Sequence, residues 1–403
     1  MLSNQLRDLQ RRSRDALGHP FLRHPSAGPL RSIGQTLASN IRRIHEIVRR
    51  SAHKQAGDPA DRSLAGLISA SHRLVSSVAS QIALCESTAR QTSAAVEVAR
   101  RLLAQERVLY GELLPLYDRV FDEVRDAKAL SPLTPMAGMP PASFVDSQHQ
   151  GGEAAVFVEG AIAARLLVWT MRDDERLVSS LPYIALAAQF QDIGRLLATS
   201  GATAGLRFRQ KRRDWLNRQH PSIGAAILGA VRGAPVELAL MAGQHHERLD
   251  GGGFPRALTA RDILPASAML AAAGRFVELS LSAGFESESA CTGENWAVDI
   301  AELLLAEAER GLWSTEFARK LWRRVVETEN DDANIPSAAA LPLETAVEEK
   351  SSGEALPEGK SARERNLQLH FEEQRLQGTH AASRGRFVAV TLDEIRRSRP
   401  KDA

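Results

Sequence analysis

Two adjacent histidines, His245 and His246, stand at the end of an apolar segment and shortly before a glycine-rich stretch, Gly251–Gly253. Neutral imidazole is the commonest protein ligand for transition metals. Because adjacent residues of a helix point about 100° apart, both rings can reach one ion only near a helix end. Glycines also let the backbone approach a ligand closely. The pair therefore indicates a metal site, although a histidine pair taken alone is more often a surface or capping feature.

Two further polar residues stand at the boundaries of apolar segments. Asp192 follows a segment that ends at Phe190, and His220 precedes Pro221, so that His220 and Pro221 are predicted to open a helix. Taken singly, an aspartate or a histidine in such a place is usually a helix cap. Their order is more specific: Asp-x-Gly-Arg, then His-Pro-x-x-Gly-Ala, then His-His-Glu-Arg-x-Asp-Gly-x-Gly-Phe-Pro.

This series of strings resembles the HD-GYP family, a branch of the HD-domain metal phosphohydrolases, over residues 153–329. Members of that family are all-helical, bind two or three metal ions, often iron or manganese, and in many cases hydrolyse cyclic di-GMP. The resemblance implies metal-assisted hydrolysis of a phosphodiester. It also implies that one divalent transition metal ion, iron or manganese, is held by four residues: Asp192, His220, His245 and His246.

The residues that the resemblance assigns to a second metal ion are changed. The histidine expected before Asp192 is Gln191, an earlier histidine is Glu159, and a late aspartate is Gly274. Glu159 is a tentative ligand, Gln191 offers one weak carbonyl oxygen, and Gly274 offers no side-chain atom. Such a set binds a transition metal weakly. We therefore expect that the second site is lost, or that it persists only through Glu159.

The resemblance further implies contacts with phosphate. Arg195 stands where the family has a lysine that touches phosphate, and we assign Asp192 and Arg195 to catalysis. Arg195 and Arg248 can grip a phosphate bidentately, or can instead cap helices and pair with Asp250 or Asp214. Phenylalanine replaces the tyrosine of the family's final motif and keeps the ring. The candidate substrate-binding residues are Arg195, Arg248, Gly251, Gly252, Gly253 and Phe254.

The elements that must position these residues are predicted to be helices. Ala-Leu-rich segments recur across 153–329 without a sustained period of two, which predicts an all-α bundle. Across 61–129, apolar residues recur at steps of three or four, with no proline from Arg62 to Leu114 and a break or kink at Pro115. A stripe this long needs a partner, either in the same chain or in a homodimer formed through the N-terminal helices.

The remaining segments are predicted to be less regular. Residues 1–60 are polar and Arg-rich and are expected to be partly helical, and 130–152 read as a linker rich in proline and glycine. Residues 330–403 hold few large apolar side chains, which predicts a mobile, low-complexity tail.

Composition excludes some classes of partner. The chain has 51 Lys plus Arg and 49 Asp plus Glu, so its net charge gives no reason to expect nucleic acid or an anionic membrane as the main partner. Its two cysteines, Cys85 and Cys291, are far apart, which argues against a disulfide framework and suits a reducing compartment. No signal-peptide pattern and no apolar window of membrane length stand out, so we expect a cytoplasmic protein.

Three functions stay open at this point. The favoured hypothesis is a degenerate signalling domain that binds a nucleotide, such as a cyclic dinucleotide, or a partner protein with little or no hydrolysis. The second is a working phosphodiesterase that uses one metal ion or a second site rescued by Glu159. The third is a scaffold in which the retained ligands form a metal-free polar network. The changes at Gln191 and Gly274 favour the first hypothesis, whereas the retained His-His-Glu-Arg string argues against the third.

Overall fold

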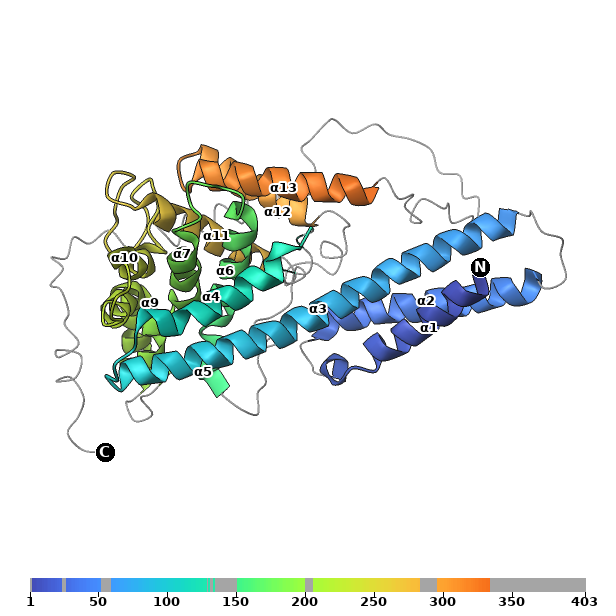
Figure 1. Cartoon of the computed structure of the whole chain (residues 1–403), viewed down its shortest axis with the longest axis horizontal. Helices are drawn as coiled ribbons and strands as arrows, with labels where there is room; N and C mark the ends of the chain where they lie inside the picture. The colour runs from blue at the N-terminus through green and yellow to red at the C-terminus, as the bar shows by residue number, and fades with distance from the viewer. Residues whose placement is uncertain are drawn as a thin grey trace. The chain divides into compact units, whose positions relative to one another are not determined.

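The computed structural model describes residues 2–23, 27–51, 59–128, 130, 133–134, 151–199, 206–282 and 296–333. Over these residues the chain consists of helices joined by turns (Figure 1). The 3-10 helices are η1 (Pro20–Arg23) and η4 (Ile193–Arg195). The α-helices are α1 (Leu2–Leu17), α2 (Gly28–Ser51), α3 (Pro59–Leu103), α4 (Tyr110–Arg125), α5 (Gly151–Ala155), α6 (Val158–Met171), α7 (Leu181–Phe190), α8 (Leu196–Thr199), α9 (Leu206–Leu228), α10 (Val236–Gln244), α11 (Pro265–Ser282), α12 (Trp296–Glu309) and α13 (Thr315–Ala333).

The predicted all-α fold is confirmed. Within the ranges described, extended pairing is limited to isolated bridges, one between Leu109 and Arg232 and one between Asp250 and Thr259. The core is aliphatic, as the low aromatic content indicates, and it is centred on α6, which packs against α4, α7, α11 and α13.

The expectation that the sequence has no apolar window of membrane length is wrong, because α6 lies in such a window. The window Gly152–Met171 has 20 residues and is apolar enough to cross a membrane by length and composition, so such a window does exist. However, 83% of that window is buried inside the molecule. The apolar side chains of α6 are therefore covered by neighbouring helices, as in the central helix of a bundle.

The N-terminal half of α3 finds its partners in the same chain. Its apolar stripe, which includes Val75 and Val78, is buried, and α1 and α2 pack against it. On α2, Leu37 and Ile44 are fully buried and lie on the same face of the helix. The stripe is thus covered within the chain, and the homodimer stays a prediction.

The break after α3 lies elsewhere than predicted. The helix ends at Leu103, Gln105 adopts a left-handed conformation with φ 61°, and α4 starts at Tyr110, so that Pro115 lies inside α4. The turn is held by pairing with a distant segment. The N–H of Tyr110 donates to the carbonyl of Arg232 at 2.9 Å, and the N–H of Arg232 donates to the carbonyl of Val108 at 3.0 Å. No local breaker in the sequence reveals such a tertiary contact.

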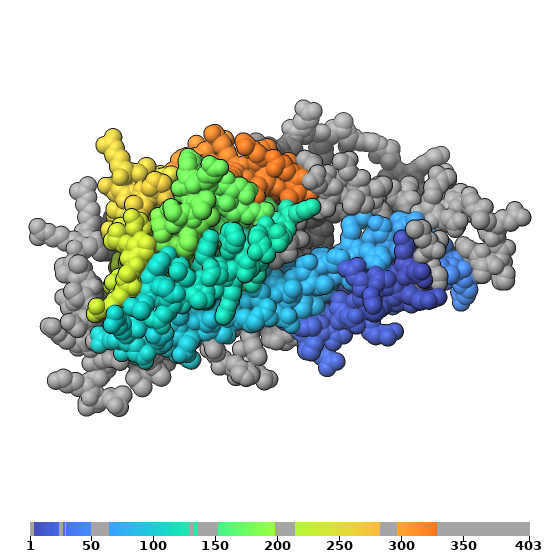
Figure 2. Space-filling view, in the orientation of Figure 1, coloured from blue at the N-terminus to red at the C-terminus, as the bar shows by residue number. Residues whose placement is uncertain are grey.

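The C-terminal half of α3 is joined to α4 and α6 through a buried arginine. Arg165 of α6 is 1% exposed, and its guanidinium pairs with Glu123 of α4 at 2.6 Å. The same group donates to the hydroxyl oxygens of Ser87 at 2.8 Å and Thr88 at 3.2 Å, both on α3. We call these four residues the Arg165 junction. Figure 2 shows the side chains of α4 lying directly against those of α3 on the visible face.

The expected domain boundaries stay predictions. Most of the predicted linker 130–152 and nearly all of the predicted tail 330–403 lie outside the described residues. The helical region 153–329 corresponds to α5 through most of α13, with α5 starting at Gly151.

Candidate metal centre

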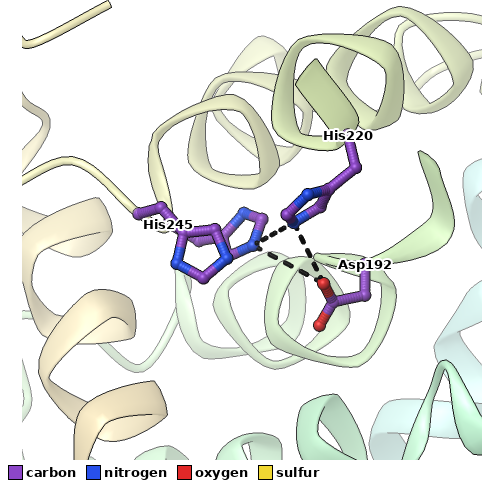
Figure 3. A group of neighbouring side chains, drawn as sticks. Asp192, His220 and His245 are labelled. Carbon is purple, nitrogen blue, oxygen red and sulfur yellow. Dashed lines mark hydrogen bonds and ion pairs between the residues drawn. The ribbon is translucent and has the colours of Figure 1, made fainter. Parts of the chain in front are cut away.

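Four side chains that are far apart in the sequence lie together: Asp192, His220, His245 and His246. Each offers one ligand atom, and these atoms all lie within 4.8 Å of one another. The Nε2 atom of His220 is 3.1 Å from Asp192 Oδ1 and 3.2 Å from His245 Nε2. His245 Nε2 is 3.8 Å from the same carboxylate oxygen. Figure 3 shows these contacts linking Asp192, His220 and His245 in a triangle, so the fold gathers the predicted ligands of one metal ion.

Asp192 is placed by a tight turn. It is the residue before η4, whose 3-10 geometry has three residues per turn, so that side chains at positions i and i+3 lie over each other. The N–H of Arg195 donates to the carbonyl of Asp192 at 2.8 Å, which closes this turn. As a result Arg195 Nε lies 2.7 Å from Asp192 Oδ1. Arg195 thus pairs with the central carboxylate.

Glycine allows the turn that carries Asp192 to approach the helix that carries His220. A Cβ atom on Gly194 would meet the backbone oxygen of His220 at 2.2 Å and the backbone nitrogen of Gly224 at 3.0 Å. Any side chain at Gly194 would therefore push η4 away from α9. The glycines of Asp-x-Gly-Arg and His-Pro-x-x-Gly serve this contact between backbones.

The environment of His220 corrects the prediction that His220 and Pro221 open a helix. The helix α9 runs without interruption from Leu206 to Leu228, and Pro221 lies inside it. A proline has no N–H to donate to the carbonyl four residues earlier, which here belongs to Asn217. That carbonyl instead accepts a hydrogen bond from His220 Nδ1 at 2.8 Å. The proline therefore frees the acceptor that orients the preceding imidazole.

His245 is oriented in a similar way at the C-terminal end of α10. The last carbonyls of a helix lack partners within the helix, and His245 Nδ1 lies 2.7 Å from the carbonyl oxygen of Ala242. With a proton on Nδ1, the Nε2 lone pair of His245 faces the cluster. The ring of His246 stacks on Phe254, with centroids 4.4 Å apart and an angle of 22° between the planes.

The protonation states suit a metal ligand set. Burial lowers the pKa of His245 to about 4 and that of His246 well below its ordinary value, so both rings are neutral at pH 7. Burial alone would raise the pKa of Asp192. The positive charge of Arg195 counteracts that effect, and the pKa of Asp192 lies below its ordinary value. The carboxylate therefore stays ionised.

The lone pairs of the cluster lack partners among the residues that the structure describes. Since Nδ1 of both His220 and His245 donates to a backbone carbonyl, their Nε2 atoms are acceptors that face each other across 3.2 Å. His246 Nε2 and Asp192 Oδ1 are buried and have no aligned hydrogen-bond partner. Buried polar atoms without partners are rare, and histidine ligands of metals use their second nitrogen in this way. One divalent cation would satisfy all four atoms, so the residues fit a metal ion.

The residues assigned to a second metal ion are less suited to it. Glu159 lies in the first turn of α6, outside the cluster of four, and burial followed by the negative charge of Asp192 raises its pKa to about 7. Gln191 is 4% exposed, and its Oε1 atom has no hydrogen-bond partner in the described part of the chain. A Cβ atom on Gly274 would meet nothing within 4 Å, so open space lies where an aspartate was expected.

The other predicted contacts with phosphate are occupied by neighbours. The guanidinium of Arg248 pairs with Asp250 at 2.5 Å and 3.1 Å and lies 6.0 Å from the centroid of the Trp313 ring. The N–H of Gly252 donates to Asp250 at 2.9 Å. A Cβ atom on Gly253 would meet the backbone nitrogen of Arg248 at 2.4 Å. Of the three predicted glycines, Gly253 is therefore required by the backbone of its own loop.

Two residues that sequence reasoning did not single out hold the loop after the histidines. Glu247 is 1% exposed, and its carboxylate accepts hydrogen bonds from the N–H groups of Arg256 at 2.7 Å and Leu258 at 2.9 Å. The amide of Gln244 donates to the carbonyl of Asp262 and accepts from the N–H of Leu264, both at 3.1 Å. The only signal in the sequence was their position beside the histidine pair.

Comparisons with known proteins agree with the motifs. Residues 181–292, which include all four members of the cluster, match the family model described as an HD domain. The chain is 28% identical over 163 residues to the cyclic di-GMP phosphodiesterase response regulator RpfG of Xanthomonas campestris pv. campestris (strain 8004). The match spans 40% of this chain and 40% of that relative. No solved structure matches.

Proposed function

Because the chain is a member of the HD-domain family, we propose that it is a divergent signalling domain of this family in the cytoplasm. It binds one divalent transition metal ion, iron or manganese, through the cluster of four residues. It also binds a phosphate-containing ligand of the cyclic dinucleotide kind, or a partner protein. Hydrolysis of that ligand is slow or absent.

The observation that carries this proposal is the contrast between the two halves of the site. In one half, four ligand atoms lie within 4.8 Å of one another, and two of them, on Asp192 and His246, are buried without a hydrogen-bond partner among the described residues. In the other half, Gln191 and Gly274 replace ligands, and the remaining carboxyl of Glu159 has a pKa of about 7. A protonated carboxyl group is a poor ligand, so this raised pKa weakens Glu159 as a metal ligand at neutral pH.

Each residue of the site has a defined part in this proposal. The three imidazoles and Asp192 hold the metal ion, which when bound supplies Lewis acidity toward a phosphoryl oxygen. Arg195 holds Asp192 in its ionised form and is the residue placed to contact the phosphate group. Phe254 covers one face of His246 and so shields that ring from water. Without a second metal ion the clamp on the attacking and leaving oxygens is missing, which makes hydrolysis slow.

A working phosphodiesterase is the second candidate. The similarity to a relative named as a cyclic di-GMP phosphodiesterase favours it, as do the four retained ligands. In this alternative Glu159 ionises and moves toward Asp192, and together they hold a second ion.

One experiment separates these functions. Metal content is measured by elemental analysis on protein purified without chelator, and hydrolysis of cyclic di-GMP is measured on the same sample. About one transition metal ion per chain with little turnover supports the proposal. Two ions with turnover would overturn it in favour of the phosphodiesterase, and no metal would leave a metal-free binding module. His245→Ala serves as the control, since it should remove the bound ion.

A further inference from the structure

The N-terminal part of α9 carries a local excess of positive charge. Between positions 207 and 218 the sequence has six basic residues and one acidic residue, although the whole chain is nearly balanced. At 3.6 residues per turn the basic positions are distributed around the helix axis and are not confined to one side. They are Arg207, Arg209, Lys211, Arg212, Arg213 and Arg218. The charge balance of the whole chain therefore hides a strongly cationic helical segment.

This segment lies before the part of α9 that packs closely in the bundle. The helix is unbroken, and its close backbone contacts with η4 lie in its C-terminal half, at His220 and Gly224. Toward the cationic segment the burial changes: Leu216 is 6% exposed, whereas Trp215 is 47% exposed and Arg218 is exposed as well. One side of α9 is therefore open to solvent ahead of the metal cluster.

An aromatic ring stands on that open side among basic positions. All five tryptophans lie in the described part of the chain, and Trp215 is the one that is exposed. Phe208 stands seven residues earlier, which is two helical turns, so position 208 lies on the same side of α9 as Trp215. Lys211 and Arg212 stand one turn before Trp215, and Arg218 stands one turn after it. The tryptophan is thus flanked by basic positions along the helix.

This arrangement favours a nucleic acid over a membrane as the partner. A helix that lies in a membrane surface needs a wide apolar face, with its charges confined to the other face. Here the basic positions surround the axis, and Leu216, the apolar neighbour of Trp215, is buried in the protein. Binding of a single strand requires aromatic faces for the bases and a track of cations for the phosphates. The segment has both.

We propose that the N-terminal half of α9 binds single-stranded nucleic acid. Trp215 stacks on an unpaired base, and the basic residues one turn away contact the phosphates. These basic residues are Lys211, Arg212 and Arg218. The surface is separate from the metal cluster, because His220 is fully buried on the same helix whereas Trp215 is exposed. The proposal goes beyond the proposed function and does not depend on a bound metal ion.

The role of the tryptophan is tested by fluorescence anisotropy with the full chain and a labelled oligouridine of about 16 nucleotides. Trp215→Ala should weaken binding about fivefold to a hundredfold, because a stacked base is lost. Trp215→Phe keeps an aromatic face and should retain most of the affinity. Val236→Ala, at a position of α10 that is 66% exposed, is the matched control and should bind like the wild type. Equal losses in Trp215→Ala and Val236→Ala, or equal affinity for a duplex of the same length, would overturn the stacking.

The role of the cations is tested by the dependence of binding on salt. A variant that combines Lys211→Gln, Arg212→Gln and Arg218→Gln should bind at least tenfold more weakly at low salt. The slope of log affinity against log salt should become shallower by about 2, because each phosphate contact on a single strand contributes about 0.7. The control combines Arg42→Gln, Arg43→Gln and Arg49→Gln at exposed positions of α2, which removes the same charge from another helix. Equal losses in both variants would mean that the overall charge binds the strand and would overturn the assignment to α9.

Two further measurements separate this surface from other sources of binding. An excess of cyclic di-GMP should leave oligouridine bound, and displacement would place the strand at the metal centre and overturn the proposal. Sedimentation with vesicles of phosphatidylserine and phosphatidylcholine should show no binding that depends on Trp215. Binding to these vesicles together with no binding to oligouridine would assign the segment to a membrane surface instead. Circular dichroism of each variant confirms that α9 and the bundle are folded.

Discussion

At the scale of single residues, the site depends on hydrogen bonds that each histidine makes with its own helix. His220 and His245 both use Nδ1 on a backbone carbonyl three residues earlier, those of Asn217 and Ala242. These bonds fix the tautomer and the orientation of each ring before any ligand arrives. Pro221 makes the first of them possible by leaving the carbonyl of Asn217 without its helical partner.

The substitution Pro221→Ala should therefore lower metal affinity without lowering the free energy of unfolding. Alanine restores an N–H that competes for the carbonyl of Asn217 and favours the helix, so the free energy of unfolding should stay equal or rise. The orientation of His220 is then lost, and metal affinity should fall roughly tenfold to a hundredfold. Chemical denaturation and competition with a metal indicator measure the two quantities. Ser222→Ala, at an exposed position of the same helix, is the matched control, and equal affinity in both variants would contradict the argument.

Glu159 gives a prediction about pH. Its pKa in the folded protein is about 7, because of burial and the charge of Asp192, against an ordinary value near 4.5. The folded state therefore binds more protons than the unfolded state between these values, and stability is lost as pH rises from about 4.5 to 7. Each unit of pKa shift corresponds to about 1.4 kcal/mol, so the loss reaches roughly 3 kcal/mol.

The substitution Glu159→Gln should remove this loss, because glutamine resembles the protonated carboxyl group. Urea denaturation of the metal-free proteins should give similar free energies of unfolding at pH 5 and a higher value for the variant at pH 8. A difference between variant and wild type that is the same at both values would mean that Glu159 ionises freely in the folded protein.

At the scale of elements, close contact between backbones sets the site. The turn η4 touches α9 at Gly194, whereas Gly274 on α11 faces open space. These two glycines make a matched pair. Gly194→Ala should destabilise the protein by more than about 1 kcal/mol and reduce metal content, because η4 must move and carry Asp192 away from the histidines. Gly274→Ala should stabilise α11 by roughly 0.5–1 kcal/mol, since alanine favours a helix over glycine.

Thermal denaturation and elemental analysis of the two glycine variants provide the check. Full metal content in folded Gly194→Ala would show that Asp192 reaches the histidines without the contact between η4 and α9. A destabilised Gly274→Ala would show that the space beside α11 is filled in solution.

Much of the site could be predicted from the sequence, because its members are side chains with known ligand chemistry in an ordered series of motifs. The helical class followed from periodicity in the same way. The break before Tyr110 and the continuity of α9 through Pro221 could not be predicted, since both depend on contacts made elsewhere: the pairing with Arg232 and the carbonyl taken by His220. Glu247 was missed because its hydrogen-bond partners are backbone groups, whose positions the sequence does not reveal.

At the scale of the whole molecule, α3 belongs to two packing groups at once. Its N-terminal half packs with α1 and α2, and its C-terminal half packs with α4, α5, α6 and α9. The Arg165 junction fixes the second half through hydrogen bonds from the buried guanidinium to two hydroxyl groups of α3, while the ion pair with Glu123 joins α6 to α4. The free energy of detaching α3 therefore depends on one guanidinium, because detachment leaves this buried charged group without two of its hydrogen-bond acceptors.

Labelling of Cys85 should report this detachment. Its thiol on α3 is 4% exposed, and burial, with a contribution from Glu86, raises its pKa to about 12. In a Cys291→Ser background, iodoacetamide at pH 8 should react slowly with the native protein. Arg165→Leu should accelerate the reaction about tenfold or more, which corresponds to roughly 1.4 kcal/mol of lost stabilisation. Arg90→Leu, on the exposed face of α3, should leave the rate unchanged, and equal rates in the two variants would contradict the role of the junction.

The unbroken length of α3 has a mechanical consequence. With a rise of 1.5 Å per residue, its 45 residues form a rod of about 68 Å. The Arg165 junction acts as the fulcrum of this rod, with an arm of about 44 Å toward Pro59 and one of about 23 Å toward Leu103. If α3 pivots about this junction, a displacement at its N-terminal end produces about half that displacement at Leu103, because the second arm is about half as long. Leu103 leads into the turn between α3 and α4, which is hydrogen-bonded to Arg232. Arg232 lies in the segment that joins α9 to α10, so a force applied at the N-terminal helices would reach the helix that carries His220 and the helix end that carries His245.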